Sequence, residues 1–186
     1  CHCLGGHDNM CGHRYDGQYG ELPKGYDHKY VYSHFGYNLK VTDIQAAIAC
    51  AQIKKLSDFV AVRRKNFAYL RQLLADMTEK LELPQTDENA EPSWFGFPIT
   101  VKSGVSRDII VQTLEKNNIQ TRMLFAGNLI KHPCFNEMRA SGKGYRVIGE
   151  LTDTNRILCD TFWVGVYPGM TKKMIDYMSE VFHQAV

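Results

Sequence analysis

The segment Thr42-Asp43-Ile44-Gln45-Ala46-Ala47-Ile48-Ala49 marks the place where an irregular chain gives way to a regular one. Its Thr-x-x-Gln opening has the form of a capping box, in which the hydroxyl accepts a hydrogen bond from a first-turn amide and the Gln reaches back. The spacing of the apolar residues predicts one long helix, or two joined near Ser57-Asp58, that ends before the loop at Leu83-Pro84. Those apolar residues recur every three or four positions and include Leu56, Val60, Phe67, Leu70, Leu74 and Met77.

After this helical region the sequence alternates between strand and helix patterns. Ser106 and Thr171 are suited to cap two helices. Pro98 points to an edge strand, because Pro has no N–H to donate to a neighbouring strand. The string predicts an α/β chain, α+β in detail, in which a small sheet is covered by helices on one side. We expect strands at 93–101, 119–124 and 162–167, helices at 107–116, 149–159 and after Thr171, and a loop between 125 and 148.

Length and charge exclude several classes of protein. The 186 residues, of which 44% are hydrophobic, make one ordinary domain with a core of its own. The net charge of +2 provides no broad basic field for nucleic acid and no polybasic anchor for a membrane surface. No apolar run approaches the roughly 20 residues of a membrane-spanning helix. Because the chain opens on Cys1, without Met and without a signal peptide, we expect it to be the C-terminal piece of a longer polypeptide.

Chemically distinctive residues are concentrated at the start of the chain. Residues 1–40 hold three of the six Cys, five of the seven His and six of the ten Tyr, in about a fifth of the length. From Thr42 onward the composition is ordinary. We therefore expect three parts, namely an arm at 1–40, a long linking helix at 41–83 and a small α/β domain at 84–186.

The sharpest chemical signal is Cys1-x-Cys3-x7-Cys11. Intervening glycines let the backbone fold tightly enough for the three sulfurs to face one point. Convergent thiolates bind zinc or iron–sulfur clusters, although zinc usually takes paired cysteines at a C-x2–4-C spacing. Both readings need a fourth ligand, and His2, His7 and His13 are the spare local candidates for zinc.

Disulfide bonding and simple packing are the alternatives for the cysteines. A chain without a signal sequence is expected in the cytoplasm, where thiols stay reduced. The three scattered residues Cys50, Cys134 and Cys159 read as small packed hydrophobes and not as ligands.

The run from Gly36 to Ala49 resembles the sugar aminotransferase family of pyridoxal-phosphate enzymes, whose C-terminal half carries G-x-N-x-R before a T-[DE]-[IL]-Q-A-A helix start. The resemblance continues to Phe162-Trp163-Val164-Gly165-Val166-Tyr167-Pro168-Gly169. Together with the cysteine pattern it is similar to the iron–sulfur sugar 3-dehydrases of that family. This implies the C-terminal part of a fold-type-I pyridoxal-phosphate-dependent transferase and a homodimer with active sites between its subunits.

The resemblance also implies an activity. The substrate would be a nucleotide-linked 4-keto-6-deoxyhexose, expected as the CDP sugar, which loses its C3 hydroxyl on the way to 3,6-dideoxysugars of lipopolysaccharide. The implied cofactors are pyridoxamine 5′-phosphate or pyridoxal 5′-phosphate and a [2Fe–2S] cluster. A flavin and iron–sulfur NAD(P)H-dependent reductase would be the electron-donating partner.

Site residues are implied position by position. Cys1, Cys3 and Cys11 match three cluster ligands, with the fourth expected upstream of this chain. Asn38 matches the Asn that reaches across the dimer to the cofactor phosphate. On the substrate side, Lys40 replaces the usual Arg and loses its bidentate fork. Phe95, after Trp94, stands where the aminotransferases typically have His after Tyr. The catalytic residues are expected upstream, so the chain by itself should be inert.

Two other functions fit parts of the same sequence. The chain would belong to an ordinary nucleotide-sugar aminotransferase if the cysteine loop were unrelated to a cluster. It would be an electron-transfer module without catalysis if residues 1–40 held a cluster and the rest were scaffold. Arg122 and Arg156 are candidates for contact with a diphosphate, although such residues are more often solvated or ion-paired.

Overall fold

The computed structural model describes residues 13–32, 34–37, 39 and 41–186. The chain divides into two compact units, Cys1–Ala47 and Ile48–Val186. Within the described residues the helices are α1 (Asp43–Ile53), α2 (Leu56–Leu73), α3 (Arg107–Lys116), α4 (Asn136–Ser141), α5 (Thr152–Asp160) and α6 (Lys172–Ala185). The strands are β1 (Leu81–Glu82), β2 (Gly96–Val101), β3 (Thr121–Met123) and β4 (Thr161–Gly165). Short 3-10 turns occupy His28–Tyr30, Ala75–Met77, Leu129–Lys131 and Pro133–Phe135. No helix among the described residues is both long and apolar enough to cross a membrane.

Local contacts organise the described part of the first unit. The guanidinium of Arg14 pairs with the carboxylate of Asp27, with 2.5 Å between Nη2 and Oδ2. Farther along, the predicted capping box is confirmed. The Thr42 amide donates to Gln45 Oε1 at 3.0 Å, and the Gln45 amide donates to Thr42 Oγ1 at 3.4 Å. Helix α1 therefore begins where the sequence places it.

The predicted long helix is two helices, the second of the two arrangements expected. α1 ends at Ile53 and α2 begins at Leu56, so the break lies at Lys54-Lys55, just before the joint predicted near Ser57-Asp58. Helix α2 ends at Leu73 and is followed by a 3-10 turn and by β1. The segment 41–83 thus contains a strand as well as helices, because Leu81 and Glu82 pair with Val101 and Thr100.

The four strands form one antiparallel sheet in the order β1-β2-β4-β3. The assignment of Pro98 to an edge strand is wrong, since β2 lies inside the sheet. The reason for that assignment, the missing N–H of proline, still applies at Pro98 itself. β1 reaches only Thr100 and Val101, so Pro98 pairs with Trp163 of β4 and faces no other strand in the described part of the chain. The missing N–H therefore costs the sheet nothing there.

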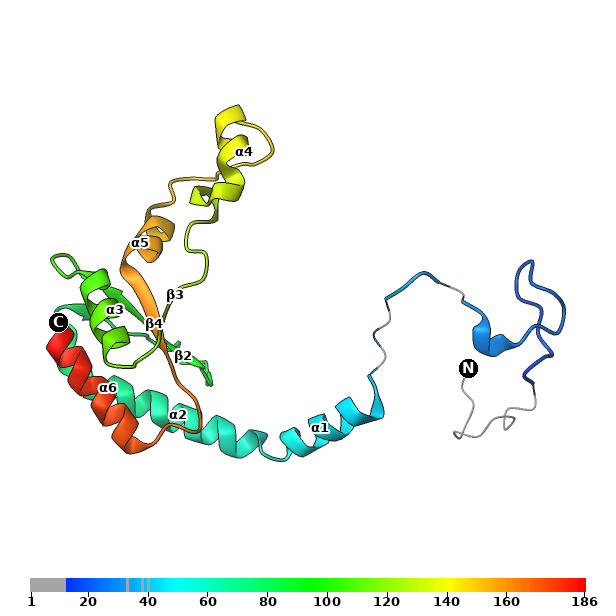
Figure 1. Cartoon of the computed structure of the whole chain (residues 1–186), viewed down its shortest axis with the longest axis horizontal. Helices are drawn as coiled ribbons and strands as arrows, with labels where there is room; N and C mark the ends of the chain where they lie inside the picture. The colour runs from blue at the N-terminus through cyan, green and yellow to red at the C-terminus, as the bar shows by residue number, and fades with distance from the viewer. Residues whose placement is uncertain (1–12, 33, 38, 40) are drawn as a thin grey trace. The chain divides into compact units, whose positions relative to one another are not determined.

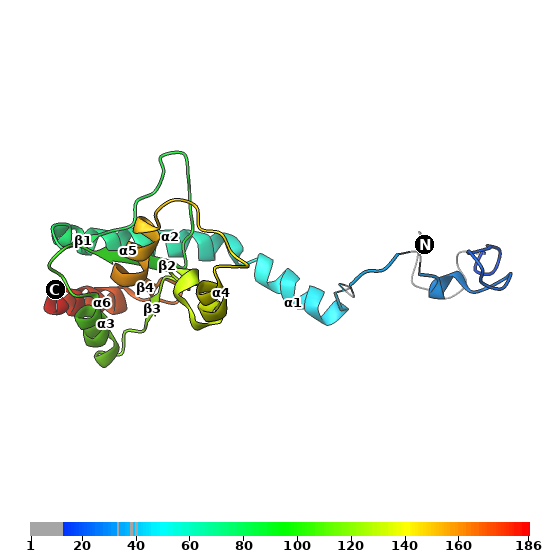
Figure 2. The ribbon, with the colours of Figure 1, turned by 90° about the horizontal axis from the view of Figure 1, so that it is seen from above.

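One face of the sheet carries the core, and α2, α3 and α6 cover it (Figure 1). Figure 2 shows α3 and α6 side by side on that face. The ring of Phe162 stacks on that of Phe182 at 6.3 Å, and Phe97 meets Phe67 at 4.8 Å. Each fully buried side chain contributes about 1.5–3 kcal/mol. The fully buried residues that join the strands to these helices include Phe97, Ile99, Phe162, Val164, Leu70, Ile110, Leu114 and Phe182.

Among the described residues, the opposite face of the sheet is covered at one end. Glu82, Thr100 and Thr161 are neighbours across β1, β2 and β4 and therefore share this face. The hydroxyls of Thr100 and Thr161 lie 2.8 Å apart, and Arg156 of α5 pairs with Glu82 at 2.5 Å. Helix α5 thus lies over this end of the sheet, and none of the described helices covers the other end.

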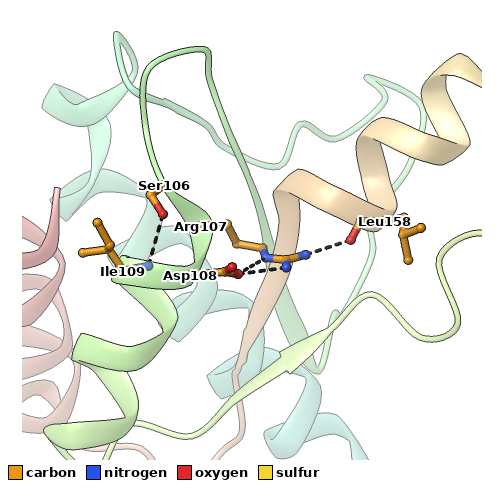
Figure 3. Close-up of polar contacts among 5 residues, drawn as sticks. All are labelled: Ser106, Arg107, Asp108, Ile109 and Leu158. Atoms are coloured by element: carbon orange, nitrogen blue, oxygen red, sulfur yellow. Dashed lines mark hydrogen bonds and ion pairs between the residues drawn. The ribbon is translucent and has the colours of Figure 1, made fainter.

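Helix α3 has the bounds that the sequence predicts, Arg107–Lys116, and its Ser106 side chain accepts from the Ile109 amide at 3.4 Å. Arg107 then donates from Nη1 to the Leu158 carbonyl at 2.7 Å and pairs with Asp108 at 2.9 Å, as Figure 3 shows. This guanidinium ties the start of α3 to α5. The helix stops at the Asn pair, where Asn118 adopts a φ of 59°.

Other details differ from the sequence predictions. The region 125–148 is not a plain loop, because it holds two 3-10 turns and α4, which projects away from the sheet (Figure 1). The helical spacing of Met174 with Ile175, Met178 and Phe182 predicts that all four side chains face inward, but Met174 is 44% exposed. The packed role expected for the three scattered cysteines is wrong, since all are free thiols on the surface: Cys50, Cys134 and Cys159.

Candidate functional site

The open face of the sheet presents a row of three side chains. Pro98 of β2 pairs with Trp163 of β4, and Trp163 pairs in turn with Arg122 of β3. Directly paired residues of neighbouring strands point to the same side of a sheet. An imino ring, an indole and a guanidinium therefore stand next to one another on the face that the helices leave uncovered.

Trp163 is fixed at the centre of this row. Its Nε1–H donates to the Met123 carbonyl at 3.1 Å, which holds the indole toward β3. A Cβ at Gly96 would lie 2.6 Å from Cε3 of the indole, so only glycine permits this approach. Phe95 meets the same ring edge to face, with the ring centroids 5.4 Å apart at 84°. The edge-to-face geometry is a favoured arrangement of two aromatic rings.

Two hollows meet at Trp163. The smaller, of about 170 Å³, is lined by Trp94, Phe95, Gly96, Pro98, Leu124, Phe125 and Trp163. Its lining side chains are apolar or aromatic, and Phe95 is 60% exposed. The larger hollow, of about 480 Å³, is bordered by Trp163, Gly165, Arg122 and Gln120 and continues toward Tyr177 of α6. Trp163 forms a wall of both hollows.

Phe125 closes the apolar hollow in a strained conformation. Its φ is 49°, which is uncommon for a bulky residue other than glycine, and its side chain is 77% exposed. The Phe125 amide donates to the Met123 carbonyl at 2.7 Å, which holds this tight turn. Backbone strain of this kind is characteristic of ligand-binding positions.

A carboxylate places the strand that carries Arg122. Glu115, near the end of α3, accepts from the Thr121 hydroxyl at 2.7 Å and from its amide at 2.6 Å. These two hydrogen bonds lower the pKa of Glu115 below its usual range. The carboxylate is therefore engaged by Thr121, and Arg122 stands exposed with no ion pair to any residue that the structure describes. Arg156, the other arginine considered for a diphosphate, is paired with Glu82.

Most of the residues that the sequence assigns to a site lie outside the described residues. These are Cys1, Cys3 and Cys11, assigned to the cluster, together with Asn38, assigned to the cofactor phosphate, and Lys40, assigned to the substrate. Their roles stay predictions. Within residues 13–32, 34–37, 39 and 41–186, no three His, Cys, Asp or Glu side chains gather into a metal site.

Phe95 is the one assigned residue that the structure describes, and it lines the apolar hollow. Its substrate role stays a prediction. Sequence reasoning missed its neighbours there, because Trp163, Leu124 and Phe125 come from a different strand and a different loop. The signal that would have found them is the pairing of β2, β4 and β3, which no local pattern reveals.

Known proteins match this chain over nearly all of its length. The lipopolysaccharide biosynthesis protein RfbH of Salmonella typhimurium is 53% identical over 99% of this chain and 41% of its own length. The dTDP-4-dehydro-2,6-dideoxy-D-glucose 3-dehydratase of Saccharopolyspora spinosa is 48% identical over 97% of this chain and 38% of its own length. The chain thus spans about two fifths of the length of these two curated relatives.

Solved structures confirm the predicted fold class. Escherichia coli GDP-4-keto-6-deoxy-D-mannose-3-dehydratase with bound hydrated PLP superposes with a TM-score of 0.69 at 31% identity, over 83% of this chain and 38% of that one. The small antiparallel sheet with helices therefore has the architecture of fold-type-I transferases. The family model for the DegT/DnrJ/EryC1/StrS aminotransferases matches residues 18–183, and the chain belongs to the DegT/DnrJ/EryC1/StrS aminotransferase family.

Proposed function

We propose that this chain is the C-terminal part of a nucleotide-sugar 3-dehydrase that uses pyridoxamine 5′-phosphate and a [2Fe–2S] cluster. Its substrate is a nucleotide-linked 4-keto-6-deoxyhexose, and its electron donor is a flavin and iron–sulfur reductase that oxidises NAD(P)H. The enzyme works as a homodimer in the cytoplasm. The observation that carries this proposal is the 48% identity to a sugar 3-dehydratase across 97% of the chain.

The cysteine motif separates this proposal from ordinary transamination. Cys1-x-Cys3-x7-Cys11 supplies three thiolates, which soft iron–sulfur clusters prefer as ligands. When bound, the pyridoxamine phosphate supplies the amine that condenses with the C4 ketone, and the cluster carries single electrons. One cluster takes four ligands, so the three cysteines require a fourth ligand elsewhere in the full-length protein.

Two described residues, Phe95 and Trp163, and two residues outside the described part, Asn38 and Lys40, have positioning roles in the proposal. Phe95 and Trp163 form an apolar wall that excludes water from one side of a bound substrate. Asn38 offers an amide donor to the cofactor phosphate, and Lys40 offers a positive charge near the substrate.

The full-length protein tests the proposal directly. Purified without oxygen, it should be brown, and the reduced protein should give the electron paramagnetic resonance signal of a [2Fe–2S] cluster. Cys3→Ser and Cys11→Ser should each abolish the visible absorption, because one thiolate ligand is lost. Cys134→Ser is the matched control and should keep the colour, since Cys134 is an exposed free thiol.

Turnover is the second half of the test. With NADH and the reductase, the full-length enzyme should remove the C3 oxygen of CDP-4-keto-6-deoxyglucose, followed by mass spectrometry as the loss of one oxygen atom. A colourless protein with stoichiometric zinc would sink the cluster assignment. Amination of C4 with glutamate as the donor, without loss of oxygen, would establish the ordinary aminotransferase instead. A coloured protein with neither activity would be the electron-transfer module.

A further inference from the structure

We propose that the open face of the sheet binds the nucleoside diphosphate portion of the substrate, with Arg122 on the diphosphate and the base stacked in the hollow of Phe95 and Trp163. The inference deepens the proposed function and rests on it, because a nucleotide-linked sugar must be the substrate. It assigns binding to two residues of β3 and β4 that lie far apart in the sequence, Arg122 and Trp163.

The side chains around the smaller hollow suit a flat aromatic base. Phe95 and Trp163 stand edge to face at 5.4 Å, and Phe125 closes the loop side of a hollow of about 170 Å³. The lining side chains bring almost no hydrogen-bonding groups, so they suit a flat ring that binds through its face. Stacking of a base on an aromatic side chain tolerates every base, because each has a π face.

The side chain beside the aromatic hollow is positively charged and forms no ion pair with the described residues. Arg122 is the direct cross-strand neighbour of Trp163 and has no ion-pair partner among residues that the structure describes. Glu115 of α3 already accepts two hydrogen bonds from Thr121, the residue before Arg122. A guanidinium offers paired donors that match a phosphate, so an anionic diphosphate complements it.

The two hollows are arranged for one ligand with an apolar and an anionic part. Trp163 is their shared wall, with the aromatic hollow on the β2 side and Arg122 bordering the other, of about 480 Å³. A base in the first hollow places its diphosphate toward β3. Gly96 keeps the aromatic hollow open, since any side chain there would displace the indole of Trp163.

Calorimetric titration of the full-length holoenzyme with CDP, dTDP and GDP tests the inference. Arg122→Gln should weaken the binding of all three by about tenfold and flatten its salt dependence, because a charge-assisted hydrogen bond is lost. Arg122→Lys should recover part of the affinity. Phe95→Leu should weaken all three by about five- to tenfold, without preference for one base, through loss of stacking.

Matched variants elsewhere provide the controls. Arg146→Gln removes an exposed arginine from the loop before α5, and Phe135→Leu removes one ring of the edge-to-face pair with Tyr145 at 6.3 Å. Neither should change the dissociation constants, and melting curves should show all variants folded. If Arg122→Gln and Phe95→Leu bind nucleotides as tightly as these controls, the inference is overturned even when C3 deoxygenation proceeds. If nucleotide binding falls as expected but no deoxygenation occurs, only the proposed reaction fails.

Discussion

Helices α1 and α6 begin in the same way but differ in how many of their residues are buried. Each starts at a Thr whose hydroxyl accepts from the amide three residues on, at 3.4 Å for Thr42 and 3.3 Å for Thr171. Helix α1 contains no buried residue, whereas α6 buries five. A cap thus determines where a helix begins, and burial determines how much the helix contributes to stability.

The physical reason lies in the cost of helix formation. An isolated helix of 11 residues, the length of α1, is marginal in water because its nucleation is unfavourable. Helix α6 packs against α2 and α3 and places Phe182 in the core. Matched substitutions in the two helices test whether burial accounts for this difference.

The largest effect is expected in the core of α6. Phe182→Ala should lower the free energy of unfolding by about 3–5 kcal/mol, because it leaves a cavity beside Phe162. Phe182 is fully buried and stacks on Phe162 at 6.3 Å. Urea denaturation of the full-length protein measures the change.

Ile48→Ala in α1 is the matched change, since Ile48 is 59% exposed. It should cost less than about 0.5 kcal/mol, as surface substitutions usually do. A loss as large as that of Phe182→Ala would show that α1 is covered in the full-length protein, and the contrast between the two helices would disappear.

The caps should give the next effect in size. Thr171→Ala should lower the free energy of unfolding by about 1 kcal/mol, because the Met174 amide loses its acceptor at the start of a packed helix. Thr42→Ala removes the corresponding acceptor of the Gln45 amide. Its effect should be confined to faster hydrogen exchange in α1, without a change in global stability. Equal shifts in the melting temperature of both variants would contradict this expectation.

The smallest effect is expected from a histidine at the end of α6. Nδ1 of His183 lies 2.8 Å from the Ser179 carbonyl, and Nε2 lies 3.0 Å from a carboxylate oxygen of Asp76. Both ring nitrogens face acceptors, so these contacts favour the doubly protonated ring and raise the pKa of His183 above 6.5. The resulting stability is fully present below pH 6.5 and is lost as the pH rises through the raised pKa.

Because His183 is partly exposed, this contribution should stay below about 1 kcal/mol. His183→Gln should flatten the fall in melting temperature between about pH 6 and pH 8, since a neutral amide does not titrate there. Melting curves of the native protein and the variant across that range measure the difference. Parallel curves would show that His183 does not carry the pH dependence.

Local patterns predicted much of the fold. Ser106, Thr42 and Thr171 each begin a helix where the sequence indicated, because a capping hydroxyl acts on amides within three residues. The region 125–148 was missed, since its short turns and α4 carry no strong periodicity. The inward placement of Met174 and the burial of Cys50 were wrong, because periodicity does not show which residues a neighbouring element covers.

The candidate site was predicted only in part. A family resemblance singled out Phe95, and no pattern within the sequence linked it to Trp163, which is 68 positions away by residue number. From the sequence, Arg122 and Arg156 were equal candidates for contact with a diphosphate. Their difference is tertiary, because Glu82 of β1 pairs with Arg156 and no described carboxylate pairs with Arg122.

The amino-acid sequence was enough to establish the helix starts, the small α/β architecture, the family and the cysteine motif at Cys1, Cys3 and Cys11. Each of these depends on residues close together in the chain or on their order. The tertiary structure set the strand order, placed Trp163 and Arg122 on one face and brought Phe95 against Trp163. It did so because strand pairing joins residues that no local spacing relates, and because the burial of one sheet face against α2, α3 and α6 leaves the other face open.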